Sequence, residues 1–276
     1  TLMGLEIAKH YGKTLILCPL SVIETAWVDD CKKFYPELII TNCWANSSKK
    51  RFEAMDINSD VYVMNYESFK ILKKKILTMD FQCVIVDESQ VMKNMGAQIT
   101  NELLQLIDVI PHRFVLSGTP TPNHNSEIFP QMKFVDADVF GNNFFGFQAH
   151  YFTQDMQNPH RWYQTQENKE AYFNRLREKS VFLKKEDCVD LPPKVFQIKE
   201  FDLGSEQKRH YNNMVKNIKD NINEWSKFEF TAKLMKLREI VSGFVINKEG
   251  NIDDFETNKD KVLEQSFEEI GGKPII

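Results

Sequence analysis

The stretch from Phe81 to Gln90 constrains the fold more than any other part of the sequence. Its β-branched and apolar residues predict a buried strand, and two adjacent carboxylates, Asp87 and Glu88, follow directly. In an open parallel sheet, ligands bind just outside the carboxyl ends of the strands. There, a first carboxylate can hold Mg²⁺ and a second can orient a water molecule. A buried strand that ends in solvated acids would carry the same residues, so this motif alone leaves both interpretations open.

Strands and helices alternate through the first part of the chain. Apolar runs predict strands at residues 14–18, 38–43, 61–64, 81–86 and 113–116, and amphipathic stretches predict helices at 1–10, 22–34, 48–55, 67–77 and 98–107. Strands that are apolar throughout and alternate with helices indicate an α/β fold, a parallel sheet with helices on both faces.

The pattern changes after about residue 125. Residues 134–162 are rich in Phe, Asn and Gln without a sustained period, which predicts short helices and loops packed by aromatic side chains. The remaining elements that we predict are helices at 169–179, from 205 onward, at 230–241 and at 261–270, a strand at 195–201, an exposed charged linker at 248–261 and the opening of another strand at 271–276.

Composition excludes several classes of protein. The formal net charge of −4 gives no overall positive field that would attract nucleic acid, so any such binding must depend on local patches. The 5 cysteines are widely spaced without a C-x-x-C pair and the 6 histidines are scattered, which argues against a zinc site or a disulfide framework and for a reducing compartment. No stretch has the pattern of a signal peptide or a membrane span. We expect no membrane partner and a cytoplasmic protein, or a nuclear one if the source is eukaryotic.

Two further motifs lie where predicted strands end. Ser117 and Thr119 flank Gly118 after the strand at 113–116, and their hydroxyls could bond a carboxylate or a phosphate. Ser21 follows the strand at 14–18 and could offer a hydroxyl to a phosphate at a helix start. Each motif is also an ordinary turn or helix cap, and alone that simpler interpretation is preferred.

Other candidate motifs are rejected. Gly12-Lys13-Thr14 has the letters of a phosphate-binding loop, but such a loop follows a strand and opens a helix, whereas this triplet follows a helix and opens a strand. The basic clusters are interpreted as solvated faces because aromatic residues interleave poorly with them: Lys70, Lys73, Lys74, Lys75, Lys179, Lys184 and Lys185.

Together and in this order, the motifs resemble those of the Swi/Snf-like DNA translocases of helicase superfamily two. Residues 84–94 (VIVDESQVMKN) resemble motif II, a DEAH-type box, and residues 116–123 (LSGTPTPN) resemble motif III. The chain also has elements similar to motif Ia at 18–27, motif Ib at 63–67, the Leu-Pro-Pro-Lys signature at 182–194 and the Leu-Arg-Gln-Ile element at 237–240. The match covers nearly the whole chain, and its compact insertions suit a bacterial or phage member.

The resemblance implies a RecA-like fold of the P-loop NTPase type with α-helical insertions. Thr1 would be the last residue of the Walker A loop, with the loop's Gly and Lys upstream and the second lobe with its arginine finger downstream. The implied divisions are a first lobe at 1–125, insertion and lobe-completing elements at 126–247, and a linker with the start of the second lobe at 248–276. We therefore expect this chain alone to be nearly inactive.

Nucleotide-site roles follow from the resemblance residue by residue. Asp87 and Thr1 would hold Mg²⁺, and Glu88 would activate the water that attacks ATP. Gln90 stands where the family usually has His, so coupling to the second lobe would be altered rather than lost. Two hydroxyls would line the site and link the carboxylates to the DNA face: Ser117 and Thr119.

DNA-site roles follow in the same way. The residues expected at the DNA are Ser21, Tyr66, Lys93 and Asn94, of which Ser21 and Tyr66 would touch phosphates, contacts that carry affinity without sequence preference. Lys184 and Lys185 replace the family's paired arginines, which weakens any bidentate role at those positions.

The sequence thus predicts the ATP-binding lobe of an ATP-dependent double-stranded DNA translocase. Its cofactors would be ATP and Mg²⁺, and its partners would be double-stranded DNA and DNA-bound proteins. One alternative is another superfamily-two motor, such as the motor of a restriction system or a strand-separating helicase. Lys93-Asn94 and the Leu-Pro-Pro-Lys signature favour the translocase over this alternative. The other is a catalytically inactive DNA-binding module, which the intact carboxylates and hydroxyls make a weaker interpretation.

Overall fold

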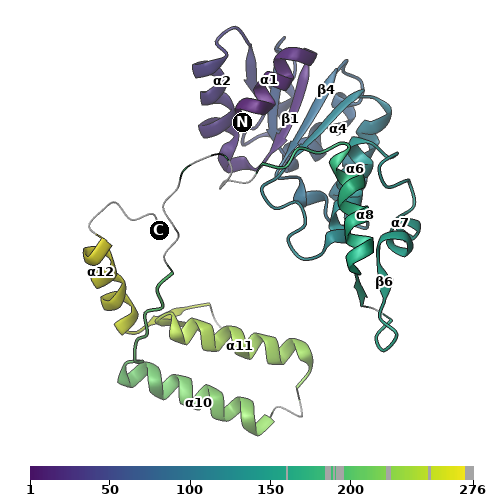
Figure 1. The fold of residues 1–276 in the computed structure, drawn as a ribbon. Coiled ribbons are helices and arrows are strands. Elements are labelled where there is room, and N and C mark those ends of the chain that lie inside the picture. The colour runs from purple at the N-terminus through teal and green to yellow at the C-terminus, as the bar shows by residue number, and fades with distance from the viewer. Residues whose placement is uncertain are drawn as a thin grey trace. The chain divides into compact units, whose positions relative to one another are not determined.

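The computed structural model describes residues 1–159, 161–183, 188, 190, 196–221, 225–247 and 250–270. The chain divides into two compact units, Thr1–Lys184 and Lys185–Ile276. Figure 1 shows a sheet covered by helices in the first unit and a helical hairpin in the second. Several sequence predictions lie outside the described residues: the strand opening at 271–276, the paired lysines Lys184 and Lys185, and the Leu-Pro-Pro-Lys signature at 191–194.

The first unit is built on a five-stranded parallel sheet in the order β2-β3-β1-β4-β5. Its strands are β1 (Thr14–Cys18), β2 (Ile40–Asn42), β3 (Val61–Asn65), β4 (Cys83–Asp87) and β5 (His112–Leu116). All five predicted strands are present, and the parallel sheet is confirmed.

Helices cover both faces of this sheet, as predicted (Figure 1). Successive residues of a strand point to opposite faces. Leu17 of β1 packs on one face with Phe69, while Ile16 packs on the other face with Leu5 and Trp27. The elements that contribute are α1 (Leu2–Tyr11), η1 (Leu20–Val22), η2 (Ile23–Val28), α2 (Asp29–Phe34), α3 (Ser48–Ala54), α4 (Tyr66–Ile76), η3 (Ser89–Met92), α5 (Gln98–Leu104) and η4 (Gln105–Asp108).

The prediction of one regular α-helix at 22–34 is wrong. It consists of the 3₁₀ turn η1, the π-helical segment η2 and the short α-helix α2. A π-helical turn is wider than an α-helical one, so a 3.6-residue pattern does not predict where its side chains point. Trp27 lies in this segment and is fully buried.

The segment after β5 forms an aromatic cluster, as expected for residues 134–162. It contains η5 (Asn125–Ile128), α6 (Phe129–Val135), α7 (Phe144–Tyr151), the short strands β6 (Thr153–Gln154) and β7 (Trp162–Tyr163), and α8 (Gln166–Arg177). Phe140 and Tyr172 stack with ring centroids 5.4 Å apart, and Phe147 contacts both rings.

The second unit contains α10 (Ser205–Asn221), α11 (Lys227–Val241), β8 (Phe244–Ile246), β9 (Ile252–Asp254) and α12 (Asn258–Ile270). The predicted helices are present, but two other predictions are wrong. The region 248–261 is no plain linker, because β9 pairs with β8 and α12 begins at Asn258. The described residues 196–201 form no strand, because their alternating apolar side chains have no sheet to pack on, and Phe196 and Ile198 are 88% and 90% exposed.

Candidate functional site

The predicted site residues gather at the carboxyl edge of the sheet. β4 ends at Asp87 directly beside Leu116, the last residue of β5, so the acidic pair and the loop that begins at Ser117 leave neighbouring strands at the same edge. Gly12 and Lys13 turn the chain from the end of α1 into β1, which directs the start of α1 back toward that edge. A Cβ on Gly4 would lie 3.5 Å from Leu116 Cδ1. The start of α1, and with it Thr1, therefore lies at the same edge of the sheet as Asp87.

Asp87 is held by three donors. Its Oδ2 accepts a hydrogen bond from Trp27 Nε1 at 3.0 Å, and its Oδ1 accepts one from the backbone N–H of Glu88 at 3.0 Å. The hydroxyl of Tyr66 donates to the backbone carbonyl of Asp87. Burial raises the pKa of the Tyr66 phenol far above its usual range, with Cys18, Asp87 and Glu88 acting in the same direction, so the phenol stays protonated and remains a donor.

Glu88 has an unusual backbone conformation. Its φ of 51° and ψ of 52° are left-handed, and it is the one residue other than glycine with a positive φ in the described part of the chain. Such conformations are costly for residues with a Cβ and cluster at functional sites.

A chain of hydrogen bonds links Glu88 to the loop after β5. Gln90 Nε2 donates to Glu88 Oε2 at 2.8 Å, and Ser117 Oγ donates to Gln90 Oε1 at 2.7 Å. Ser117 Oγ in turn accepts from the backbone N–H of Thr119 at 3.0 Å. Four predicted site residues are thus connected in one relay, in which Gln90 makes one bond as donor and one as acceptor.

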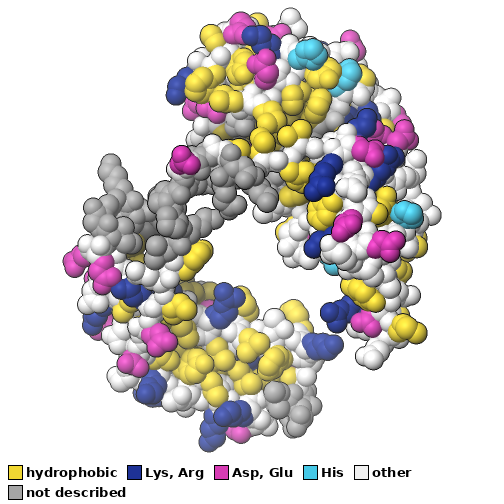
Figure 2. Space-filling model, viewed as in Figure 1, with side chains coloured by type: hydrophobic (Ala, Val, Ile, Leu, Met, Phe, Trp, Pro, Cys, Tyr) yellow, Lys and Arg dark blue, Asp and Glu magenta, His cyan; other side chains and the backbone are white. Residues whose placement is uncertain are grey.

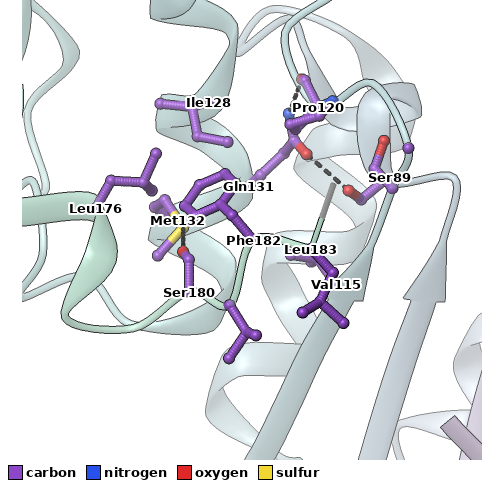
Figure 3. Close-up of a pocket in the computed structure, with 13 residues that line it drawn as sticks. Ser89, Val115, Pro120, Ile128, Gln131, Met132, Leu176, Ser180, Phe182 and Leu183 are labelled. Atoms are coloured by element: carbon purple, nitrogen blue, oxygen red, sulfur yellow. Dashed lines mark hydrogen bonds between the residues drawn. The ribbon is translucent and has the colours of Figure 1, made fainter. Parts of the chain in front are cut away.

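Gln131 of α6 is a buried hub that the sequence analysis missed. Its Oε1 accepts from Ser89 Oγ at 2.7 Å, and its Nε2 donates to the carbonyls of Pro120 and Glu127 at 2.7 and 3.0 Å. Figure 3 shows the side chain reaching between Ser89 and Pro120 beside a pocket of about 220 Å³. Gln131 thus connects Ser89, the residue after Glu88, to the loop that contains Ser117. The available signal was a glutamine in the mostly apolar first turn of Phe129–Val135.

Replacing Gln131 by leucine is expected to lower the free energy of unfolding by about 2–3 kcal/mol, because Ser89 Oγ and two carbonyls lose a partner in a fully buried place. The measurement is urea unfolding of wild type and variant. The matched control is Gln98→Leu at an exposed position of α5, for which we expect a change within about 0.5 kcal/mol. Equal stability of the Gln131 variant and wild type would contradict the claim that these three hydrogen bonds of Gln131 stabilise the fold.

The predicted DNA-contacting residues are not part of this network, with one exception. Ser21 is exposed in η1, and Lys93 is exposed at the end of η3. Asn94 uses its Oδ1 to accept from the backbone N–H of Gly96 at 2.9 Å, which shapes the turn that follows. Tyr66 is the exception, because its hydroxyl points inward to Asp87 in this structure. Contact of these four residues with DNA stays a prediction.

The donor set at Asp87 fits Mg²⁺ bound together with a phosphate. Mg²⁺ prefers oxygen ligands and is usually held by one or two carboxylates plus substrate phosphates. No group of three His, Cys, Asp or Glu residues in the described part of the chain could form an all-protein cage. The oriented Asp87 carboxylate and the Thr1 hydroxyl at the same edge fit a Mg²⁺ site in which a bound phosphate supplies further oxygen ligands.

The rejected triplet Gly12-Lys13-Thr14 lies between the end of α1 and the start of β1, as expected from the sequence. The Lys13 ammonium lies 5.7 and 5.6 Å from the ring centroids of Tyr62 and Phe81. It therefore makes cation–π contacts at the amino ends of the strands, away from the acidic edge.

Comparison with known proteins places this geometry in a family. The model of the SNF2-related domain matches residues 3–249. The chain is 25% identical over 278 residues to "Putative protein p41" of Acyrthosiphon pisum secondary endosymbiont phage 1, covering 95% of this chain and 60% of that protein. It is 32% identical over 146 residues to a Caenorhabditis elegans homolog of the SWI/SNF-related matrix-associated actin-dependent regulator of chromatin subfamily A-like protein 1, covering 51% of this chain and 21% of that protein.

The fold is similar to that of the Sulfolobus solfataricus SWI2/SNF2 ATPase core, whose structure was solved in complex with double-stranded DNA. The TM-score is 0.53 at 20% identity, with 98% of this chain and 56% of that chain covered. This likeness confirms the predicted RecA-like α/β fold. The chain spans 60% or less of the length of each of these proteins.

Proposed function

The chain belongs to the SNF2-related family, and on that premise we propose that it is the ATP-binding first lobe of an ATP-dependent double-stranded DNA translocase. The single observation that carries the proposal is the hydrogen-bonded relay from Glu88 through Gln90 to Ser117 beside the oriented Asp87 carboxylate. A DNA-binding module that had lost its catalytic activity would have no need to hold the Glu88 carboxylate on a left-handed backbone. Nor would it need to link this carboxylate by hydrogen bonds to the loop at Ser117.

The whole activity belongs to a longer protein, because the matched relatives extend well beyond the region that this chain covers. We assign residues 1–125 to the first RecA-like lobe, 126–247 to insertion and lobe-completing elements, and 248–276, which include β9 and α12, to the connection to a second lobe and the start of that lobe. The cofactors are ATP and Mg²⁺, and the partners are double-stranded DNA and proteins bound to it.

When bound with ATP, Mg²⁺ neutralises the charge that develops on the transferred phosphoryl group. Asp87 would hold the ion, and the Thr1 hydroxyl would be a second ligand. Glu88 would orient the attacking water and accept its proton. Gln90 already donates to Oε2 of that carboxylate, so we assign the proton to Oε1.

Gln90 would couple the position of Glu88 to the position of the loop at Ser117. Rotation of its amide would break the bond to Glu88 and the bond to Ser117 together, because both ends of one amide are used. Movement of the loop at Ser117 and Thr119 would therefore change the orientation of Glu88. This supplies a physical route by which DNA or a second lobe could control hydrolysis.

DNA binding would depend on local contacts rather than on net charge. Lys and Arg side chains are interspersed with Asp and Glu on the face shown in Figure 2, and the formal net charge is −4. The proposed contacts are the hydroxyl of Ser21, the exposed pair Lys93 and Asn94, and Tyr66, whose hydroxyl would first have to leave the carbonyl of Asp87. Contacts to phosphates would give binding that is independent of sequence and falls with added salt.

The test is ATP hydrolysis by the longer protein with and without duplex DNA. We expect stimulation by duplex DNA of any sequence. Absence of stimulation would contradict the translocase. Release of a strand from a forked duplex would instead identify a strand-separating motor, and DNA binding without hydrolysis would identify a DNA-binding module.

A further inference from the structure

Trp27 makes a specific bond to the candidate metal ligand from deep inside the core. Its side chain is 0% exposed and packs in the cluster that contains Leu5, Ile16 and Ile85, yet its Nε1 donates to Asp87 Oδ2 at 3.0 Å. An indole N–H is a donor only, with a single proton in the ring plane. The ring's position therefore fixes which carboxylate oxygen it bonds and in which direction that oxygen points.

The position of this ring is fixed in turn by a close approach of α1. A Cβ built on Gly4 would lie 2.5 Å from Trp27 Cη2 and 2.9 Å from Cζ3, distances that real Cβ atoms essentially never show. The indole therefore packs directly on helix backbone, and only glycine at position 4 permits this without movement. Trp27 itself belongs to the π-helical segment η2, and π-helical turns occur frequently at functional sites.

We propose that Trp27, seated against Gly4, is a positioning residue that holds the Asp87 carboxylate in the orientation that binds the metal ion. The inference rests on the proposed function. With Oδ2 held by Trp27 and Oδ1 held by the backbone N–H of Glu88, the carboxylate cannot rotate freely. Partners that orient a metal ligand typically change metal affinity by about 10–100-fold when they are removed.

Two substitutions separate this role from simple core packing. Trp27→Phe keeps an aromatic ring in the niche but removes the N–H. Gly4→Ala keeps the N–H but forces the ring out of the position in which it bonds Asp87. The matched control is Trp44→Phe, because Trp44 is half-buried and packs against the same core cluster, whereas its indole has no bond to Asp87 in the described structure.

The experiment measures Mn²⁺ binding to the longer protein with a non-hydrolysable ATP analogue, by electron paramagnetic resonance of free Mn²⁺. We expect the dissociation constant to rise about tenfold in Trp27→Phe and in Gly4→Ala and to stay unchanged in Trp44→Phe. Thermal unfolding of each variant identifies any that does not fold. Folded Trp27→Phe protein with wild-type Mn²⁺ affinity would overturn the inference.

A second measurement needs no substitution in the sample that is titrated. The indole N–H resonance of Trp27, assigned by its loss in Trp27→Phe, should broaden when Mn²⁺ and the analogue are added to wild type. An unaffected resonance in protein that has bound Mn²⁺ would overturn this inference alone. If wild type binds no Mn²⁺ with the nucleotide, the proposed function fails and the positioning role with it.

Discussion

Replacing Glu88 by glutamine is expected to reduce DNA-stimulated ATP hydrolysis about 10²–10⁴-fold, the usual contribution of a general base. The amide has nearly the same shape but cannot accept the proton of the attacking water. Its oxygen can still accept from Gln90 Nε2, and its backbone tolerates φ of 51° no worse than that of glutamate. The variant should therefore keep wild-type stability and nucleotide binding.

The measurement is the steady-state rate constant of the longer protein at saturating ATP and duplex DNA, together with nucleotide binding and thermal unfolding. The control is Glu167→Gln at an exposed position of α8, which should hydrolyse ATP at the wild-type rate. Wild-type turnover by the Glu88 variant would remove Glu88 from the chemistry. Loss of nucleotide binding or of folding in this variant would show a structural role instead.

The acidic edge of the sheet could be predicted because its signals are local. Each strand is buried in a parallel sheet and is therefore marked by a short apolar run. Alternation with helices then places all the strand ends on one side, so the sequence alone predicts that Asp87 and Ser117 lie near each other. The register of β4 with β5, in which Asp87 lies opposite Leu116, bears this out.

The contacts that position these side chains could not be predicted in the same way. Trp27 lies 60 residues before Asp87, and Gln131 lies 42 residues after Ser89. Their bonds depend on a π-helical turn, a close helix approach and the packing of α6, none of which follows from period or propensity. Tyr66 illustrates the same point, because motif resemblance identified the residue but not the inward direction of its hydroxyl.

The wrong predictions in the second unit have physical reasons as well. Alternating apolar residues at 195–201 suggested a strand, but alternation stabilises a strand only where a neighbouring strand and a core are present. The charged, Gly-, Asn- and Asp-rich composition at 248–261 suggested a linker, yet its described residues include β9, which pairs with β8, and the start of α12. Gly250 adopts φ of 87°, and the backbone N–H of Asn247 donates to the carbonyl of Asn251 at 2.9 Å.

Replacing Asp87 by asparagine should cost both activity and stability, unlike the change at Glu88. Both oxygens of Asp87 accept, one from Trp27 Nε1 and one from the backbone N–H of Glu88. Asparagine offers one oxygen and one NH₂ group, so a donor must face a donor on one side. We expect the free energy of unfolding to fall by about 1–3 kcal/mol. We also expect hydrolysis to fall at least about 100-fold, because the neutral side chain no longer attracts Mg²⁺.

The stability effect of this change tests the bond to Trp27 independently of any catalysis. In a Trp27→Phe background one of the two donors is gone, so Asp87→Asn should cost less there than in wild type, and a double-mutant cycle by urea unfolding measures the difference. Asp29→Asn, at an exposed aspartate in the first turn of α2, is the control and should change stability little in either background. Equal costs in the two backgrounds would mean that the indole does not bond the carboxylate in solution. Wild-type hydrolysis with Mg²⁺ by the asparagine variant would mean that Asp87 is not the metal ligand, whatever the cycle gives.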